Sequence, residues 1–219
     1  MSANSQLPES LKKHSDYFIS RGVTILQAPN IVLFLPSSRR DALQLPIEKD
    51  MLVSQDTLFH DLLNNESAIP HLIGFYEDPF RHPIATFPHL PFIIRSASLM
   101  LELRDGLHGF NGTVHGGLTC AVMDEAMGSL LAQNDILNRQ ARAKGIIPSD
   151  SKKFTAAVTA RMDVKYRRPI PTPQVVVATV SLDRIEGRKI YMHVVVKDEG
   201  NKECASCDGV FISIPNGKL

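Results

Sequence analysis

The residues best suited to chemistry lie in a glycine-rich stretch that leads directly into an apolar segment. His115, Gly116 and Gly117 precede residues 118–132, which contain no proline and only two charged side chains, the adjacent acids Asp124 and Glu125. This composition predicts a buried helix. An acid in apolar surroundings is costly unless it is paired. We therefore expect at least one of the two acids to have a partner or a chemical function.

The two glycines predict what the start of this helix can bind. The first turn of a helix has backbone N–H groups without intrahelical partners, and the positive end of the helix dipole lies there. At Gly116 and Gly117 no side chain blocks these groups, so they could hold an anion or polarise a carbonyl oxygen. Alternatively, the glycines only allow the chain to turn tightly into the helix.

The spacing between the helix start and the acids predicts a site built by two chains. Asp124 lies eight residues after Gly116, which is about 12 Å along a helix axis at about 1.5 Å per residue. A carboxylate side chain cannot bridge that distance. If both groups act on one substrate carbon, they come from the antiparallel helices of a symmetric dimer. Helix geometry does not choose between Asp124 and Glu125, because adjacent residues point about 100° apart.

The segments around the helix predict an α+β fold in which an antiparallel sheet wraps a long central helix. A strand is expected at residues 92–103, and the helix is expected to end near Gln133, before a polar connection at 134–150. Short joints with proline or glycine then separate four strands, which suits antiparallel neighbours in a meander. The expected strands are residues 154–167, 174–185, 189–197 and 203–214. In the first of them, Val158 to Tyr166 alternate strictly, with Thr159 on the face opposite Tyr166.

Residues 1–90 are expected to form an N-terminal extension, partly helical, that packs on a main domain at residues 91–219. Apolar spacing predicts one amphipathic helix within residues 7–20 and another within residues 48–63. The remainder, residues 69–90, contains four prolines and three histidines. We interpret it as a loop with solvent-exposed histidines rather than as a metal site.

Composition argues against nucleic acid, metal ions and a bilayer as partners of this chain. The formal charge of +1 gives no field for nucleic acid, and the lone Cys204-x-x-Cys207 pair cannot complete a tetrahedral metal site. No apolar run approaches the length of about 20 residues that spans a bilayer. We expect no metal, no cofactor, no nucleic acid and no integral membrane segment, in a cytoplasmic protein. Basic residues near the N-terminus and the final Gly217-Lys218-Leu219 leave mitochondrial or peroxisomal targeting as alternatives.

Two stretches resemble a known family. His115-Gly116-Gly117, an acid nine residues after the histidine, and Gly128 are similar to the His-Gly-Gly, or PaaI-like, branch of the hotdog-fold acyl-CoA thioesterases. Residues 158–171 and 186–189 resemble the thioesterase superfamily members of the four and five type, the mitochondrial-type long-chain enzymes of animals. The resemblance covers about residues 90 to 214. It implies a hotdog fold, a homodimer or dimer of dimers, and hydrolysis of a medium- to long-chain fatty acyl-CoA in fatty acid metabolism.

The resemblance also implies roles for single residues. Asp124 corresponds to the catalytic acid, which acts as a general base on water or as a nucleophile, and Gly116 to the backbone N–H that polarises the thioester carbonyl. His115 corresponds to the motif histidine, which either braces the loop before the helix or transfers a proton. Thr159 corresponds to a hydroxyl that places the water, and Gly117 is assigned to substrate binding.

Four basic residues correspond to positions that contact coenzyme A in the animal relatives: Lys165, Arg167, Arg188 and Lys189. Cationic side chains at strand ends suit the phosphates of this substrate. One departure concerns a polar role before the motif. Some family members have an asparagine six residues before the motif histidine, where this chain has Gly109, so that role is absent or has moved to Asn111.

Two other functions share the expected fold. A hydratase or dehydratase of acyl thioesters needs a histidine paired with the acid, and the sequence has none between residues 116 and 192. A non-catalytic acyl-CoA-binding or partner-binding protein could also retain the fold. Chain-length preference is not readable from the sequence, although Met123, Met127 and Phe110 are candidates for lining an acyl tunnel.

Overall fold

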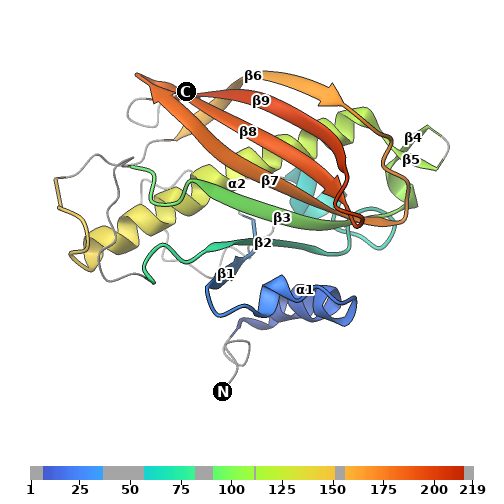
Figure 1. The fold of residues 1–219 in the computed structure, drawn as a ribbon, viewed down its shortest axis with the longest axis horizontal. Coiled ribbons are helices and arrows are strands. Elements are labelled where there is room, and N and C mark those ends of the chain that lie inside the picture. The colour runs from blue at the N-terminus through green and yellow to red at the C-terminus, as the bar shows by residue number, and fades with distance from the viewer. Residues whose placement is uncertain (1–6, 37–56, 82–90, 111, 151–155, 215–219) are drawn as a thin grey trace.

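A computed structural model describes residues 7–36, 57–81, 91–110, 112–150 and 156–214 of the chain. Within these ranges a seven-stranded antiparallel sheet, in the order β1-β2-β3-β7-β8-β9-β6, curves around the long helix α2, Gly116–Ala143. The strands are β1 (Ile31–Phe34), β2 (Leu72–Glu77), β3 (Ser96–Leu103), β6 (Ala157–Tyr166), β7 (Gln174–Glu186), β8 (Lys189–Asp198) and β9 (Glu203–Ser213). Figure 1 shows α2 crossing behind the sheet. The predicted α+β hotdog class, an antiparallel sheet around a central helix, is confirmed.

Helix α2 is held in the concave side of the sheet by its apolar residues. Met123, Met127 and Leu130 are fully buried and belong to one core with residues of the surrounding strands. The helix is longer than predicted, because it continues past Gln133 to Ala143. The buried Asn134 explains the difference: its side-chain oxygen accepts hydrogen bonds of 2.7 and 2.9 Å from the N–H groups of Ile93 and Ile94. A polar residue that suggested a connection thus satisfies the backbone of a buried loop.

Strand β6 does not pair with β7, contrary to the predicted four-strand meander. It forms the edge of the sheet beside β9, whereas β7 lies between β3 and β8. The joint between β6 and β7 contains Pro169, Pro171 and Pro173, and it crosses the end of the sheet instead of forming a tight turn. One edge of β6 therefore has no neighbouring strand within the described chain.

A β-bulge in β6 changes which side chains share a face. Thr159 pairs with Phe211 and Arg161 with Val210, so two residues of β6 oppose one step of β9. The strict alternation predicted from Val158 to Tyr166 is therefore wrong. After the bulge the sides exchange, and Met162 and Val164 pack against the core while Val158 is exposed. Thr159 and Tyr166 consequently lie on the same side of the strand, facing α2.

The segment before residue 91 contributes two strands that the sequence analysis did not predict. Short β1 extends the sheet beyond β2, and Phe34 pairs with Gly74. A Cβ atom at Gly74 would lie only 2.2 Å from the Phe34 ring, so the glycine allows this aromatic side chain to cover the strand. Pro29, Pro36 and Pro70 flank these strands and obscured them, since proline interrupts strand patterns. The division of the chain at residue 90 stays a prediction.

The two helices predicted in this segment have different outcomes. Helix α1, Glu9–Ser20, confirms the first and ends before Gly22, which has a positive φ of 89°. Instead of an amphipathic helix within residues 48–63, the described part has a short π-helical turn at Leu58–Leu62, and residues 48–56 lie outside the described ranges. His71, which directly precedes β2, is half-buried and stacks on Tyr17, so the prediction of a solvent-exposed histidine is wrong at this position. His82 and His89 lie outside the described ranges.

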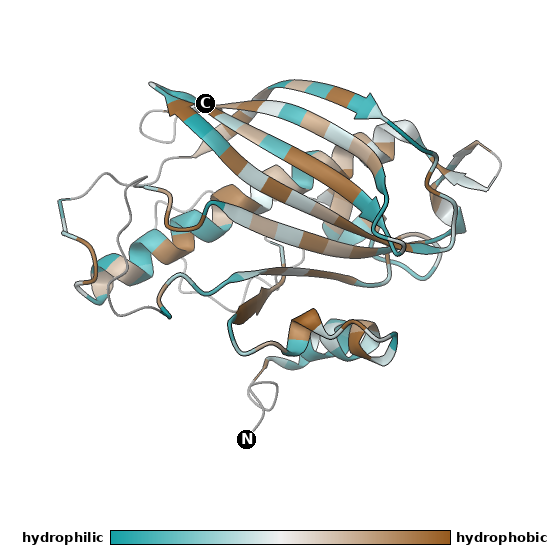
Figure 2. Cartoon of the chain, in the orientation of Figure 1, coloured by the Kyte–Doolittle hydropathy of each residue, from teal (hydrophilic) through white to brown (hydrophobic). Residues whose placement is uncertain are grey.

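Helix α1 packs on the face of the sheet opposite α2. Leu11 and Phe18 form a second core with Ile73 and Met100 of β2 and β3. In Figure 2 the edge strand β1 is hydrophobic throughout, as its sequence Ile-Val-Leu-Phe requires. The sheet is thus covered by a helix on each side over part of its area. None of the helices in the described ranges combines the length and apolarity needed to cross a membrane.

Candidate active site

The structure brings Asp124 and Thr159 together. The Thr159 hydroxyl on β6 donates a 2.7 Å hydrogen bond to Asp124 Oδ1 on α2. Asp124 is half-buried between the helix and this edge strand. The hydrogen bond orients one carboxylate oxygen and, since a carboxylate has several acceptor positions, leaves others for water. Glu125, the next residue, points about 100° away around the helix axis.

Cys120 lies one helical turn before Asp124 on the same side of α2. Burial, followed by the negative charge of Asp124, raises the pKa of the Cys120 thiol. The thiol therefore stays protonated at neutral pH and is a poor nucleophile. Of the two side chains, the carboxylate is the one suited to activate water.

His115 caps the start of α2. Its Nδ1 atom accepts a 2.9 Å hydrogen bond from the N–H of Gly117, and its carbonyl accepts from the N–H groups of Leu118 and Thr119. The ring nitrogen that faces the helix is thus an acceptor and carries no proton. This geometry agrees with the loop-bracing alternative for His115. It also engages the Gly117 N–H, which therefore points into the loop.

The Gly116 N–H differs from that of Gly117. In the part of the chain that the structure describes, no group accepts a hydrogen bond from it. Gly116 is exposed at the positive end of a 28-residue helix. Of the two motif glycines, Gly116 thus has the N–H that remains available for a carbonyl oxygen.

Tyr166 is a site residue that the sequence analysis did not identify. Its hydroxyl donates a 2.8 Å hydrogen bond to the carbonyl of Gly116. The sequence contained no usable signal for this contact, because strict alternation placed Tyr166 and Thr159 on opposite faces of the strand. Only the bulge in β6 allows both side chains to reach α2.

Gly109 is fixed by its contact with His115. A Cβ atom at position 109 would lie 2.6 Å from both Cα and Cδ2 of His115, so a larger residue there requires the loop to shift. The side chain of an asparagine therefore has no room in this arrangement. The alternative role of Asn111 lies outside the described residues.

The two main chemical groups do not meet within one chain. Gly116 and Asp124 lie on the same continuous helix, eight residues apart, which separates them by about 12 Å along its axis. Thr159 and Tyr166, which contact Asp124 and Gly116, are likewise seven residues apart on β6. Each chain thus presents a helix start at one end of the β6 edge and a carboxylate near the other.

The four basic residues divide between the same two ends. Arg188 donates a 3.0 Å hydrogen bond to the carbonyl of Ser213, and Lys189 pairs with Ile212 near the Thr159 end. Lys165 pairs with Ser206, at the Tyr166 end. Ser206 and Ser213 are seven residues apart on β9, or about 24 Å at about 3.4 Å per residue. One chain therefore does not gather all four residues around one ligand.

Two of these side chains also have acidic partners. Lys165 lies 3.2 Å from Asp208, and Arg167 lies 3.5 Å from Glu203. All four side chains are substantially exposed, so these ion pairs contribute little stability and leave the cations accessible. Arg167, Arg168 and Glu203 line a small open pocket of about 470 Å³ just after β6.

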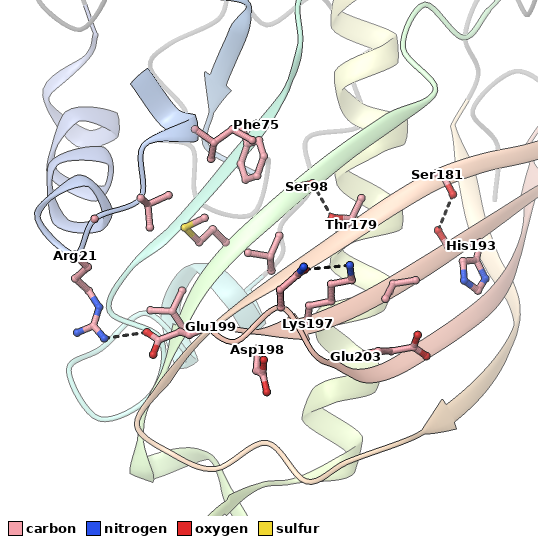
Figure 3. A pocket seen from close by; sticks show the side chains of 18 residues that line it. Arg21, Phe75, Ser98, Thr179, Ser181, His193, Lys197, Asp198, Glu199 and Glu203 are labelled. Carbon is pink, nitrogen blue, oxygen red and sulfur yellow. Dashed lines mark hydrogen bonds and ion pairs between the residues drawn. The ribbon is translucent and has the colours of Figure 1, made fainter. Parts of the chain in front are cut away.

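A larger cavity, of about 1150 Å³, lies on the other face of the sheet. Its floor includes Val177, Thr179 and Val195, and the Arg21–Glu199 ion pair of 2.9 Å spans one end (Figure 3). Neither Asp124 nor Gly116 lines it. The candidate active site lies instead along the open edge between α2 and β6.

Comparison of the sequence with known proteins identifies the family of this chain. The sequence profile of the thioesterase superfamily matches residues 111–205, which include the helix start, Asp124 and β6. Verlamelin biosynthesis protein B of Lecanicillium sp is 31% identical over 169 residues, which are 69% of this chain and 70% of that protein. The acyl-coenzyme A thioesterase THEM4 of Bos taurus is 28% identical over 49% of this chain, and the match spans 37% of its own length.

Among solved structures, the PaaI protein of E. coli from the phenylacetic acid degradation operon aligns with a TM-score of 0.44 at 14% identity, covering 54% of this chain and 72% of that one. The sequence matches do not distinguish the PaaI-like branch from others, so that assignment stays a prediction. They do confirm the prediction of a thioesterase enzyme at the level of the family. The family profile includes the candidate site, and this chain covers 70% of a relative that is 31% identical to it. The chain therefore belongs to the thioesterase superfamily.

Proposed function

We propose that this protein hydrolyses a fatty acyl-CoA to a free fatty acid and coenzyme A. The observation that carries the proposal is the Thr159–Asp124 hydrogen bond, which holds a carboxylate beside an open strand edge, together with the Gly116 N–H at the helix start, which has no acceptor among the described residues. A thioester carbonyl is already electrophilic. A carboxylate that activates water and a backbone donor for the developing oxyanion are sufficient for its hydrolysis. Similarity to relatives named acyl-coenzyme A thioesterase supports the substrate class.

The site we propose takes one part from each of two chains. The edge of β6 has no neighbouring strand in the described chain, and Val158, Tyr166 and nearby Phe110 are exposed apolar residues. Two copies that pair antiparallel along this edge place the Gly116 end of one opposite the Asp124 end of the other. The distance of about 12 Å within one chain is then replaced by a contact between chains.

The basic residues support the same arrangement. Antiparallel pairing of the edges brings Lys165 and Arg167 of one copy toward Arg188 and Lys189 of the other. The two groups lie about 24 Å apart within one chain, and across the pair they face a single site. Coenzyme A carries phosphates at the far end of a long arm, so a cluster of cations beside the carboxylate suits it.

In the mechanism that follows, the acyl thioester carbonyl accepts a hydrogen bond from the Gly116 N–H of one chain. Asp124 of the other chain removes a proton from water, which attacks the carbonyl carbon to form a tetrahedral oxyanion. Collapse of this intermediate breaks the carbon–sulfur bond, and the proton held by Asp124 passes to the departing thiolate. In the alternative mechanism the Asp124 carboxylate attacks the carbonyl carbon directly, the carbon–sulfur bond breaks with departure of the coenzyme A thiolate, and water then hydrolyses the resulting mixed anhydride to the fatty acid and the free carboxylate.

The test is release of free thiol from palmitoyl-CoA by the wild type and by Asp124→Ala. We expect steady release by the wild type and a loss of at least about 100-fold in the variant, because the base is removed. Binding without thiol release by the wild type would instead indicate an acyl-CoA-binding protein. Addition of water to an enoyl-CoA would indicate a hydratase. A panel of acyl-CoA esters from short to long then determines the chain-length preference.

A further inference from the structure

Two hydrogen bonds hold one peptide unit at the start of α2. The carbonyl of Gly116 accepts from the Tyr166 hydroxyl at 2.8 Å, and the N–H of Gly117 donates to His115 Nδ1 at 2.9 Å. This carbonyl and this N–H belong to the same peptide bond, which is planar. The peptide is therefore restrained at both ends, by a strand residue on one side and a loop residue on the other.

This restraint matters because the neighbouring peptide carries the candidate oxyanion donor. The Gly116 N–H is joined to the restrained peptide only through the Gly116 Cα. A glycine has wide φ/ψ freedom, so by itself it does not fix the direction of its own N–H. The Tyr166 ring also lies against this glycine, since a Cβ atom there would be 3.5 Å from the ring carbon Cζ and from the hydroxyl. The contact limits the motion of the helix start on the side of β6.

From this geometry we propose that Tyr166 is a positioning residue for the reaction, and that its hydroxyl fixes the direction of the Gly116 N–H toward the substrate oxygen. This inference rests on the proposed thioesterase function. Tyr166 does not exchange a proton with the substrate in this role. It acts through the peptide of Gly116, and the bulge in β6 is the feature that points its side chain at the helix.

One strand thereby positions both halves of the chemistry. Near one end of β6, Thr159 holds the carboxylate of Asp124, and at the other end Tyr166 holds the helix start. In the proposed two-chain site these halves serve different active sites, so a disturbance of the strand affects both. An oxyanion donor is effective only when it is aimed before the reaction begins.

The experiment compares the wild type with Tyr166→Phe, which loses only the hydroxyl, and with Tyr191→Phe, a matched control on β8 outside the site. Hydrolysis of palmitoyl-CoA is measured with hydrogen–deuterium exchange of residues 115–120. We expect Tyr166→Phe to lower kcat about tenfold with KM within about twofold, since small misplacement of a catalytic group is expensive. Exchange of the helix start rises in the same variant. Tyr191→Phe should change none of these quantities.

An unchanged kcat in Tyr166→Phe overturns the inference, and so does a rise in KM at constant kcat, which would make Tyr166 a substrate contact. Tyr166→Leu, which also loses the contact of the ring with Gly116, serves as a second variant and should lose at least as much activity as Tyr166→Phe; a smaller loss than in Tyr166→Phe overturns the inference. Failure of the proposed function looks different: the wild type then releases no thiol, or releases it independently of Asp124. In that case the exchange data alone decide the role of Tyr166, and unchanged exchange at residues 115–120 overturns it.

Discussion

The hydroxyl of Thr159 and the carboxylate of Asp124 are joined by a 2.7 Å hydrogen bond across the boundary between the edge strand β6 and the central helix α2. The two residues are 35 positions apart in the chain. Their contact gives the acid a fixed orientation on an otherwise open edge. It also links the strand with the free edge to the group that we propose activates water.

Replacement of Thr159 tests this orientation. Thr159→Val keeps the shape of the side chain but removes the donor, and a hydrogen bond to a charged group is worth about 1.5–3 kcal/mol. We expect kcat for palmitoyl-CoA to fall by about 10- to 100-fold, with little change in KM. Thr159→Ser keeps a hydroxyl and should recover most of the rate. Equal activity of Thr159→Val and the wild type would contradict a role for this contact.

Two substitutions of His115 distinguish its two possible roles, helix capping and proton transfer. In His115→Asn the side-chain oxygen can still accept from the Gly117 N–H, because asparagine is a favoured helix N-cap. We expect this variant to retain activity within a few-fold, whereas His115→Ala loses the cap and about 1 kcal/mol of stability. Activity and chemical denaturation are measured for both. If the two variants lose activity to the same extent, the imidazole has a role in proton transfer that capping does not explain.

Mixed dimers test whether each site uses two chains. Asp124→Ala keeps the helix start, and Gly116→Val keeps the acid but places a branched side chain against Tyr166. Each variant alone should be inactive. After co-refolding in equal amounts, half of the dimers are mixed and each has one intact site of two, so about a quarter of wild-type activity should return under two-fold symmetry. Inactivity of mixtures that tagged purification shows to be mixed dimers would rule out the cross-chain arrangement.

Arg188 and Lys189, the basic residues at the Thr159 end of the sheet, should affect KM rather than kcat. Removal of a charge by Arg188→Ala should raise KM for acyl-CoA several-fold, because the phosphates lose a charge-assisted contact. KM for an acyl-pantetheine thioester, which lacks the nucleotide phosphates, should change much less. Arg139→Ala is the matched control, since Arg139 pairs with Asp135 on the far part of α2. A similar rise with both substrates would show that Arg188 does not contact the nucleotide.

Stability should depend on pH through His71, which lies where α1 meets the sheet. Its ring stacks on Tyr17 at 3.7 Å between centroids, and its Nδ1 lies 3.3 Å from His14 Nδ1, a contact that requires one neutral ring. Burial lowers the pKa of His71, against the opposing charge of Glu102, and the nearby Lys13 lowers it further. The unfolded chain therefore binds this proton more readily. The free energy of unfolding should fall as pH drops below about 6.5.

Urea denaturation at pH 7.5 and 5.5 measures this effect. His71→Phe keeps the ring stack but cannot titrate, so its midpoint should change less between the two pH values than that of the wild type. His60→Gln is the control, because His60 is on an exposed turn. A separate contribution to the pH dependence comes from the carboxylate of Asp208, whose pKa is lowered by its hydrogen bond to His193. Its contribution to the free energy of unfolding is lost only as this carboxylate protonates, below about pH 4. An equal change of the urea midpoint between pH 7.5 and 5.5 in the wild type and in His71→Phe would contradict the assignment to His71.

The sequence alone determined the local elements and the chemistry that they carry. The proline-free apolar run after Gly117 predicted the central helix, and the polar and apolar alternation with short joints predicted the strands, because both patterns follow from the backbone period of a single segment. The separation of Gly116 from Asp124 followed from helix rise alone. The choice of Asp124, Thr159 and His115 came from the family resemblance, and the structure places the first two in contact.

Only the tertiary structure decided which side chains meet. Pairing partners are not written in the pattern of one strand, so the place of β6 beside β9, the addition of β1 and β2, and the separation of Arg188 from Lys165 were not predictable. The bulge near Ala160 belongs to the same group, because it exists only relative to the neighbouring strand. One extra residue in that ladder reverses the facing of all later side chains, and for this reason Tyr166 reaches the helix start while strict alternation had pointed it away.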